Sequence, residues 1–315
     1  MARRRLLIIE ATLLLLLQHG TTVSTSKIAQ AAGIAEGTVF RAFKDKDELI
    51  GACVLAALRP DVPIAATGSI VGLVAAQRIY GRETTGFIDQ AVAQDVVNLA
   101  VVAPLIVVLG IRARRGSVRA YTCWLGCLAF TAYSYAIYAF SIHFGSLFLA
   151  WLAVLGLSFY ALLGSLTTVD TAVVARWFGN RAMPVTGWTL IIAAAAFGLL
   201  WLSGIVPDLL AGRASASAAA LNLPTNPVHV LDLALFLPAV LASGTLLLRR
   251  QPLGYVTAPG VLTFLILTCL PVLVTPLMSL ANGRDPAWGA LAPLALVSVA
   301  TTGILYRTLR RPGSE

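Results

Sequence analysis

From residue 62 onwards, the sequence consists of apolar runs about as long as a membrane-spanning helix, separated by short loops that contain arginine and proline. A helix needs roughly 20 apolar residues to cross the hydrocarbon core of a bilayer. The runs predict eight spans, so most of the chain is expected to be α-helical. The expected spans cover residues 62–79, 93–111, 120–140, 147–166, 186–206, 228–248, 257–280 and 289–306.

The composition also indicates a membrane protein. The 315 residues are 58% hydrophobic and only 12% charged, whereas about 25% of the residues in soluble domains are charged. The net charge of +9 comes with arginines that mostly lie in the loops between apolar runs. We therefore attribute most of the positive charge to membrane topology rather than to nucleic-acid binding.

Arginine is unequally divided between alternate loops, which predicts a multi-pass orientation in the cell membrane. Membrane proteins keep an excess of positive charge in their cytoplasmic loops. If the first 60 residues are cytoplasmic, eleven arginines fall inside and four outside, and the C-terminus is also cytoplasmic. The inner ones are Arg112, Arg114, Arg115, Arg119, Arg176, Arg181, Arg249, Arg250, Arg307, Arg310 and Arg311, and the outer ones are Arg78, Arg82, Arg213 and Arg284.

The first 60 residues differ from the rest because they contain all the lysines of the chain, Lys27, Lys44 and Lys46. We therefore predict two domains, a small head at 1–60 and a polytopic membrane domain at 61–315. The first residues, MARRR followed by LLIIEATLLLLL, have the pattern of a signal peptide. Glu10 interrupts the apolar run, and Ile8, Ala11 and Leu15 fall on one helical face. A first helix of the head is the favoured interpretation, with a signal or extra span as the alternative.

The segment STSKIAQAAGIAEGTVFRAFKDKDEL, residues 24–49, predicts a helix-turn-helix. Ser24 or Thr25 can cap a helix that runs to about Ala32, and Gly33 can end it in the left-handed conformation. A second short helix follows at 36–43. Two short helices joined by a glycine-containing turn are typical of DNA-binding proteins. The expected core consists of Ile28, Ala29, Ala32, Ile34, Val39, Phe40 and Phe43.

The spacing of IIEATLLLLLQHG (8–20), IAQAAG, GTVF and FKDKDEL resembles the N-terminal domain of the TetR/AcrR (tetracycline-repressor) family over about residues 5–58. The resemblance implies that Ser24, Gly37, Thr38, Phe40 and Lys46 contact double-stranded DNA. Ala35 stands where the family often has a capping serine, and Phe40 where it often has tyrosine. Other polar residues of the segment complete the predicted DNA-binding set: Thr25, Lys27, Glu36, Arg41 and Lys44.

The membrane part carries no zinc-protease, P-loop or nucleophile-elbow motif, so we expect no enzymatic activity, cofactor or metal site. The four cysteines of the whole chain lie in apolar helical contexts and are expected to be buried; they are Cys53, Cys123, Cys127 and Cys269. Asp89 and Asp95 lie near the outer end of the second span, where they are either solvated or bind a cation or proton. Three tyrosines of the third span form either an interfacial belt or a pocket for an apolar ligand; they are Tyr133, Tyr135 and Tyr138.

The combined features predict a membrane-anchored transcriptional regulator whose membrane domain is a sensor for an unknown small-molecule effector or an anchor. The alternatives are a transporter or channel with a vestigial or regulatory head, and a structural membrane protein with a non-functional head. The first span contains a G-x-x-x-G at Gly68 and Gly72. Such small residues let two membrane helices approach closely, so they either form a homodimer or pack against other spans.

Overall fold

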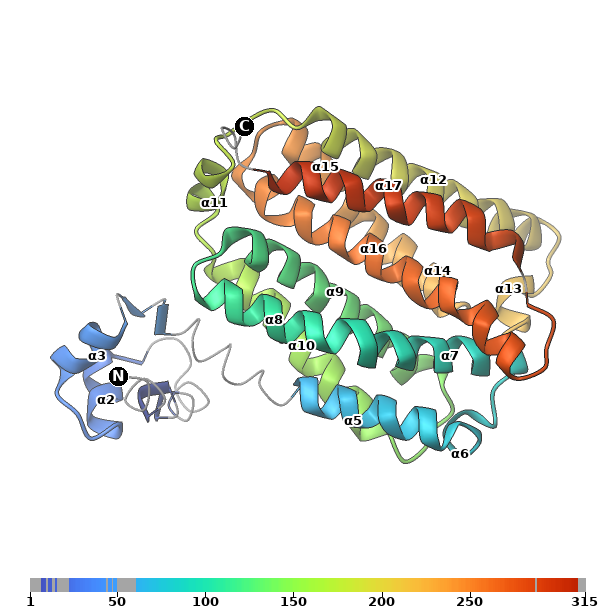
Figure 1. The fold of residues 1–315 in the computed structure, drawn as a ribbon, viewed down its shortest axis with the longest axis horizontal. Coiled ribbons are helices and arrows are strands. Elements are labelled where there is room, and N and C mark those ends of the chain that lie inside the picture. The colour runs from blue at the N-terminus through green and yellow to red at the C-terminus, as the bar shows by residue number, and fades with distance from the viewer. Residues whose placement is uncertain are drawn as a thin grey trace. The chain divides into compact units, whose positions relative to one another are not determined.

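Every regular element in the described part of the chain is a helix, in agreement with the predicted all-α fold (Figure 1). The computed structural model describes residues 7–9, 11, 12, 15, 23–43, 45, 46, 48, 49, 61–286 and 288–310. The chain divides into two compact units, Met1–Asp61 with Leu157–Val169, and Val62–Gly156 with Asp170–Glu315. The predicted domain boundary at residue 60 lies outside the described residues and stays a prediction.

The head contains a small apolar core around two short helices, α2 (Thr25–Ala31) and α3 (Glu36–Ala42). Ile8 is fully buried in this core and Leu15 packs against it, as the helical face of the N-terminal residues predicts. Phe40 is an exception among the predicted core residues, because its side chain is 51% exposed. The buried members are Ile8, Ile9, Val23, Ile28, Ala29, Val39, Phe43 and Leu49.

Among the residues that the structure describes, seven helices are long and apolar enough to cross a membrane, compared with the eight predicted spans. Two of them are continuous helices with an internal π-helical segment: α7, η2 and α8 over Thr85–Arg114, and α14, η3 and α15 over Pro227–Leu248. The other five are α9 (Val118–Ser141), α10 (Phe148–Thr168), α12 (Pro184–Leu210), α16 (Pro252–Ala281) and α17 (Leu291–Leu309). Shorter elements are α6 (Ala76–Tyr80), α11 (Thr171–Trp177), α13 (Ala216–Ala219) and η4 (Trp288–Ala290).

The described part of the first predicted span begins with helix α5, which covers Asp61–Val74. Its 14 residues extend about 21 Å at 1.5 Å per residue. The helix breaks at Ala75, whose φ of −121° and ψ of 36° are not helical. Val62 borders the same small cavity as Val102 and Ile106. Helix α5 therefore runs antiparallel to α7 and α8 and begins at the level of Ile106.

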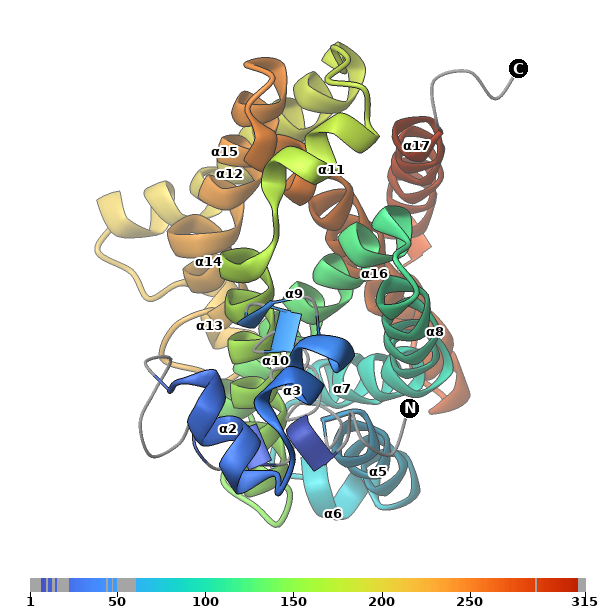
Figure 2. The same cartoon turned by 90° about the vertical axis from the view of Figure 1, so that its left-hand side faces the viewer.

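Helices α9 and α16 form the centre of the second unit, and α12 and α17 lie at its surface (Figure 1, Figure 2). Close contact between α9 and α16 requires glycine, because a Cβ on Gly126 would lie 2.2 Å from the carbonyl oxygen of Gly260. Large apolar side chains on the outer helices are exposed, for example Leu199 at 68% and Leu296 at 71%. Exposed apolar faces of this extent are typical of surfaces that contact lipid or another protein.

The tyrosines of α9 point into the bundle, so the predicted aromatic belt is wrong. Tyr133, Tyr135 and Tyr138 are at most 5% exposed. The ring of Tyr133 packs edge-on against Phe236, with 4.7 Å between ring centroids. The hydroxyl of Tyr138 lies 3.2 Å from Oδ1 of Asp95 and 3.0 Å from the carbonyl oxygen of Ala91. These rings therefore join helices within the bundle.

Asp95 and Asp89 are both buried, with 1% of each residue exposed, so neither is a solvated carboxylate. Tyr80 donates a hydrogen bond of 2.6 Å to Oδ2 of Asp95. The carboxylate of Asp89 accepts hydrogen bonds from Ser279 and Asn282, each at 2.8 Å, and from the guanidinium of Arg284. These contacts connect the start of α7 to the end of α16 and the residues after it.

Gly72 of the G-x-x-x-G makes a close contact inside the chain, which favours packing against other helices over a homodimer at this position. Gly68 and Gly72 are both buried. A Cβ on Gly72 would lie 2.0 Å from Oδ2 of Asp95 and 2.6 Å from the Tyr80 hydroxyl oxygen. The absence of a side chain at Gly72 thus makes room for the Asp95 carboxylate rather than for a second copy of the helix.

Replacing Gly72 with alanine is expected to destabilise the second unit by about 1–3 kcal/mol, the usual cost of overpacking a filled interior. Gly68→Ala is the matched control, because no atom lies within 4 Å of its added Cβ. Thermal unfolding of the two variants in the same detergent measures the difference. Equal midpoints for Gly72→Ala and Gly68→Ala would contradict the close contact between Gly72 and Asp95.

Candidate nucleic-acid interface

The turn between α2 and α3 is held by backbone geometry at Gly33. Gly33 has a φ of +65°, which glycine adopts without steric cost. The amide of Gly33 donates to the carbonyl of Gln30 at 3.1 Å, and the amide of Ile34 donates to that of Ala29 at 3.0 Å. This pair of hydrogen bonds is a Schellman motif, which ends a helix and redirects the chain. The predicted role of Gly33 is confirmed.

The start of α2 is capped by a side chain, whereas the start of α3 is not. The Ser24 hydroxyl accepts a hydrogen bond of 3.3 Å from the amide of Lys27. Ala35 occupies the cap position of α3 and has no side-chain hydrogen bond to offer. The Thr25 hydroxyl instead donates to Oε1 of Glu36 at 2.6 Å. This contact joins the first residues of both helices and so helps to fix the angle between them.

Helix α3 has one buried and one exposed side. Val39 is 2% exposed and Phe43, directly after the helix, is 1% exposed, so both face the head core. The opposite side, which we call the exposed α3 face, consists of Glu36, Gly37, Phe40 and Arg41. These positions are spaced by one, three and four residues, which places them on one side of a helix.

The exposed α3 face suits contact with a nucleic acid in shape. Gly37 has no side chain, and no atom would lie within 4 Å of an added Cβ, so another molecule can approach the helix backbone there. An α-helix with its side chains is about 10–12 Å across, which matches the roughly 12 Å width of the major groove. Arg41 and the exposed Lys27 supply positive charge.

The structure brings most of the predicted DNA-binding residues to the two helices and their ends. Ser24, Lys27, Glu36, Gly37, Phe40 and Arg41 are exposed, and Thr25, Thr38 and Lys46 are half-buried. Lys44 lies outside the described residues. The contact between Thr25 and Glu36 had no signal in the sequence, because eleven residues and a turn separate the two side chains. In this contact the Thr25 hydroxyl donates its hydrogen bond to another residue of the head.

The second unit holds two further carboxylates near π-helical segments, and π segments often occur at functional sites. Asp95 precedes η2 (Asn98–Val102), and Asp232 begins η3 (Asp232–Phe236). The indole nitrogen of Trp201 donates to Oδ2 of Asp232 at 2.8 Å. In the part of the chain that the structure describes, no three histidine, cysteine or acidic side chains form a metal-binding group.

The cysteines of the second unit occupy apolar surroundings, as expected. Cys123 and Cys127 on α9 and Cys269 on α16 are buried and unoxidised. Cys53 lies outside the described residues.

Residues 8–53 match the family model described as "Bacterial regulatory proteins, tetR family". The matched region contains α2, the Gly33 turn and α3. A comparison with curated proteins and with solved structures finds no match to the chain.

Proposed function

We propose that the chain is a membrane-anchored transcriptional regulator that binds double-stranded DNA through its N-terminal helix-turn-helix. The exposed α3 face, within the region that matches the tetR family model, is the observation that carries this proposal. In helix-turn-helix proteins the second helix lies in the major groove, with residues near its start at the base edges. Gly37 and Thr38 are such residues here.

The proposed contacts divide between bases and phosphates. Close approach at Gly37 brings Thr38 and Phe40 to the base edges, and the phenyl ring of Phe40 offers an apolar contact of the kind that thymine methyl groups accept. Lys27, Arg41 and Lys46 supply cations for the phosphates, which position a protein on DNA without reading its sequence. The Ser24 hydroxyl accepts a hydrogen bond from the Lys27 amide, so its own proton can be donated to a phosphate oxygen. Lys44 belongs to the same proposed set.

The membrane location is supported by the exposed apolar side chains and by the arginines at one end of the second unit. The ends of α8 and α17 and helix α11 lie toward the same side, and α6 and α13 lie toward the other (Figure 1). Of the outer arginines, Arg213 and Arg284 already pair with aspartates. The arginine-rich side is therefore our proposed cytoplasmic side, and it includes the end of α17 before the C-terminus.

The N-terminal head is assigned to the same cytoplasmic side. Helix α5 runs antiparallel to α7 and α8, so its first residues point toward the arginine-rich ends of the spans. From the level of Ile106 to Arg114, about 12 Å of helix remain. The residues before Asp61 would have to cover this distance for the head to reach the cytoplasm.

Two copies of the head would then read two DNA half-sites, through a dimer contact other than the buried Gly68 and Gly72.

Replacing Lys46 with alanine is expected to weaken binding to all duplex sequences to a similar degree. One lost phosphate contact lowers the slope of log affinity against log salt by about 0.9. The measurement is fluorescence anisotropy of the full chain in neutral detergent, with labelled DNA from around its own gene, at several salt concentrations.

Lys46→Arg is the matched variant, because it retains the charge and should retain the salt slope. An unchanged affinity and slope in Lys46→Ala would contradict the proposed docking.

A second candidate function is transport across the membrane with a vestigial head. The buried Asp95 and Asp232 favour it, because ionisable side chains inside a membrane protein often mark ion or proton pathways. DNA binding distinguishes the two functions, since a vestigial head would show none while transport would persist without residues 1–60.

A further inference from the structure

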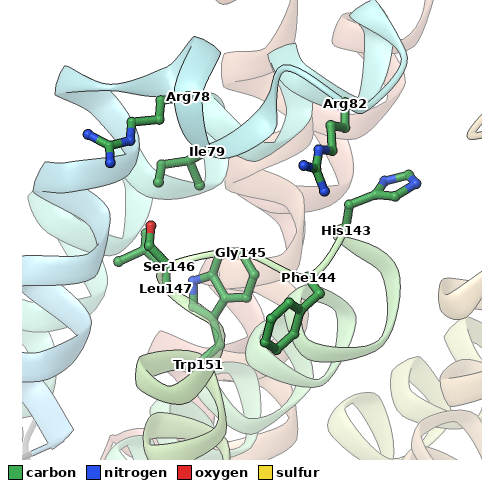
Figure 3. Close-up of a pocket in the computed structure, with 9 residues that line it drawn as sticks. All are labelled: Arg78, Ile79, Arg82, His143, Phe144, Gly145, Ser146, Leu147 and Trp151. Atoms are coloured by element: carbon green, nitrogen blue, oxygen red, sulfur yellow. The ribbon is translucent and has the colours of Figure 1, made fainter.

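A pocket lies between the segment after α5 and the loop that precedes α10. Its volume is about 100 Å³. Figure 3 shows Arg78, Ile79 and Arg82 on one side of the pocket and the loop from His143 to Leu147 on the other, with the Trp151 ring beneath this loop. Trp151 is 2% exposed and forms the apolar floor, while both arginines are exposed to solvent. The pocket therefore combines an apolar base with a cationic opening.

No ion pair within the described part of the chain neutralises the two arginines of this pocket. At the same end of the unit, Arg213 forms an ion pair of 3.0 Å with Asp208, and Arg284 pairs with Asp89. Arg78 and Arg82 have no ion pair among the residues that the structure describes. Of the four arginines at this end, the two without an acidic partner thus line one pocket.

The carboxylate of Glu83, the residue after Arg82, contacts the pocket wall at His143. Its Oε1 lies 2.8 Å from the amide nitrogen of His143 and 2.8 Å from Nδ1 of the same residue. Glu83 is buried, with 1% of its side chain exposed. This double contact holds the loop in place, so the wall opposite the arginines is formed before any ligand binds. Such preorganisation lowers the entropic cost of binding.

We propose that this pocket binds a phosphate group through Arg78 and Arg82, with the Ser146 hydroxyl as a further donor. Guanidinium groups match phosphate oxygens with paired hydrogen bonds, and a hydroxyl can add a third. A volume of about 100 Å³ admits one such group with a small substituent over the Trp151 ring. The phosphate can belong to a soluble small molecule or to a lipid headgroup, because the pocket lies at the end of the spans.

The test compares the full chain with the variant Arg78→Gln/Arg82→Gln in two settings. In neutral detergent, inorganic phosphate replaces chloride at constant ionic strength, and the thermal midpoint and calorimetric affinity are measured. In nanodiscs, anionic phosphatidylglycerol is added to phosphatidylcholine, and the midpoint is measured again. We expect a ligand-dependent rise in midpoint in at least one setting. The double substitution should weaken affinity about tenfold for each arginine lost.

Arg213→Gln is the control, because it removes an arginine at the same end of the unit that already has an aspartate partner. It should keep the full response. A response to inorganic phosphate identifies a soluble ligand, and a response to phosphatidylglycerol alone identifies a lipid headgroup. The proposal is overturned if neither probe raises the midpoint, or if the double variant responds like the unchanged chain. The measurement involves no DNA, so its result is independent of the proposed regulation.

Discussion

Replacing Arg284 with methionine is expected to lower the free energy of unfolding by about 2–3 kcal/mol. The variant leaves the Asp89 carboxylate buried, with Ser279 and Asn282 as its remaining side-chain donors. Removing one partner of a fully buried ion pair costs about 3–5 kcal/mol. Solvent reaches part of Arg284, whose side chain is 34% exposed, so we expect a smaller loss. The Asp89 carboxylate in turn raises the pKa of the Arg284 guanidinium through their hydrogen bonds.

The matched control for this prediction is Arg213→Met. Arg213 pairs with Asp208 at 3.0 Å, but its side chain is 66% exposed, and exposed pairs contribute less than about 1 kcal/mol. Thermal or denaturant unfolding in one detergent, followed by tryptophan fluorescence, measures both variants. Adding Asp89→Asn to Arg284→Met should recover part of the loss, because the uncompensated charge disappears. Equal effects of Arg284→Met and Arg213→Met would show that the Asp89 contacts do not stabilise the bundle.

The second large effect is expected on DNA binding, from Gly37→Leu. A leucine side chain on the exposed α3 face would stand between the helix backbone and the base edges. We expect affinity for duplex DNA to fall on the order of 100-fold, the equivalent of about two lost base contacts. The fold of the head should persist, because no atom lies within 4 Å of an added Cβ at Gly37. Anisotropy and circular dichroism of the full chain measure the two properties.

Gly33→Ala is expected to have the opposite pair of effects, a lower stability of the head with a retained DNA affinity. Its φ of +65° strains any residue with a Cβ, which costs about 1–2 kcal/mol, while the position lies off the exposed α3 face. We expect a lower stability of the head and, at temperatures where it is folded, nearly unchanged DNA affinity. If Gly37→Leu retains full affinity, α3 does not enter the groove.

Features that depend only on residues close together in the sequence could be predicted from the sequence. Seven long helices and their order could be predicted because each bilayer-length apolar run satisfies its own backbone hydrogen bonds, although the predicted starts at 93 and 257 lie inside helices that begin at Thr85 and Pro252. The Gly33 turn could be predicted because glycine alone adopts its φ freely. Phe40 was assigned both to the core and to the DNA contact, and only the packing of α3 distinguished the two. The break at Ala75, which interrupts the first predicted span, has no proline or charge to mark it.

The tertiary structure alone decided which side of each long apolar helix faces inward. A helix that is apolar all around lacks the periodic contrast in sequence that identifies the buried face of an amphipathic helix. The inward direction of Tyr138 and the fit of Gly72 against Asp95 follow from neighbouring helices. The partner of Asp89 is Arg284, 195 residues away. The sequence by itself therefore determined the helices and the family resemblance of the head, whereas the buried carboxylates and the phosphate pocket depend on contacts between segments distant along the chain.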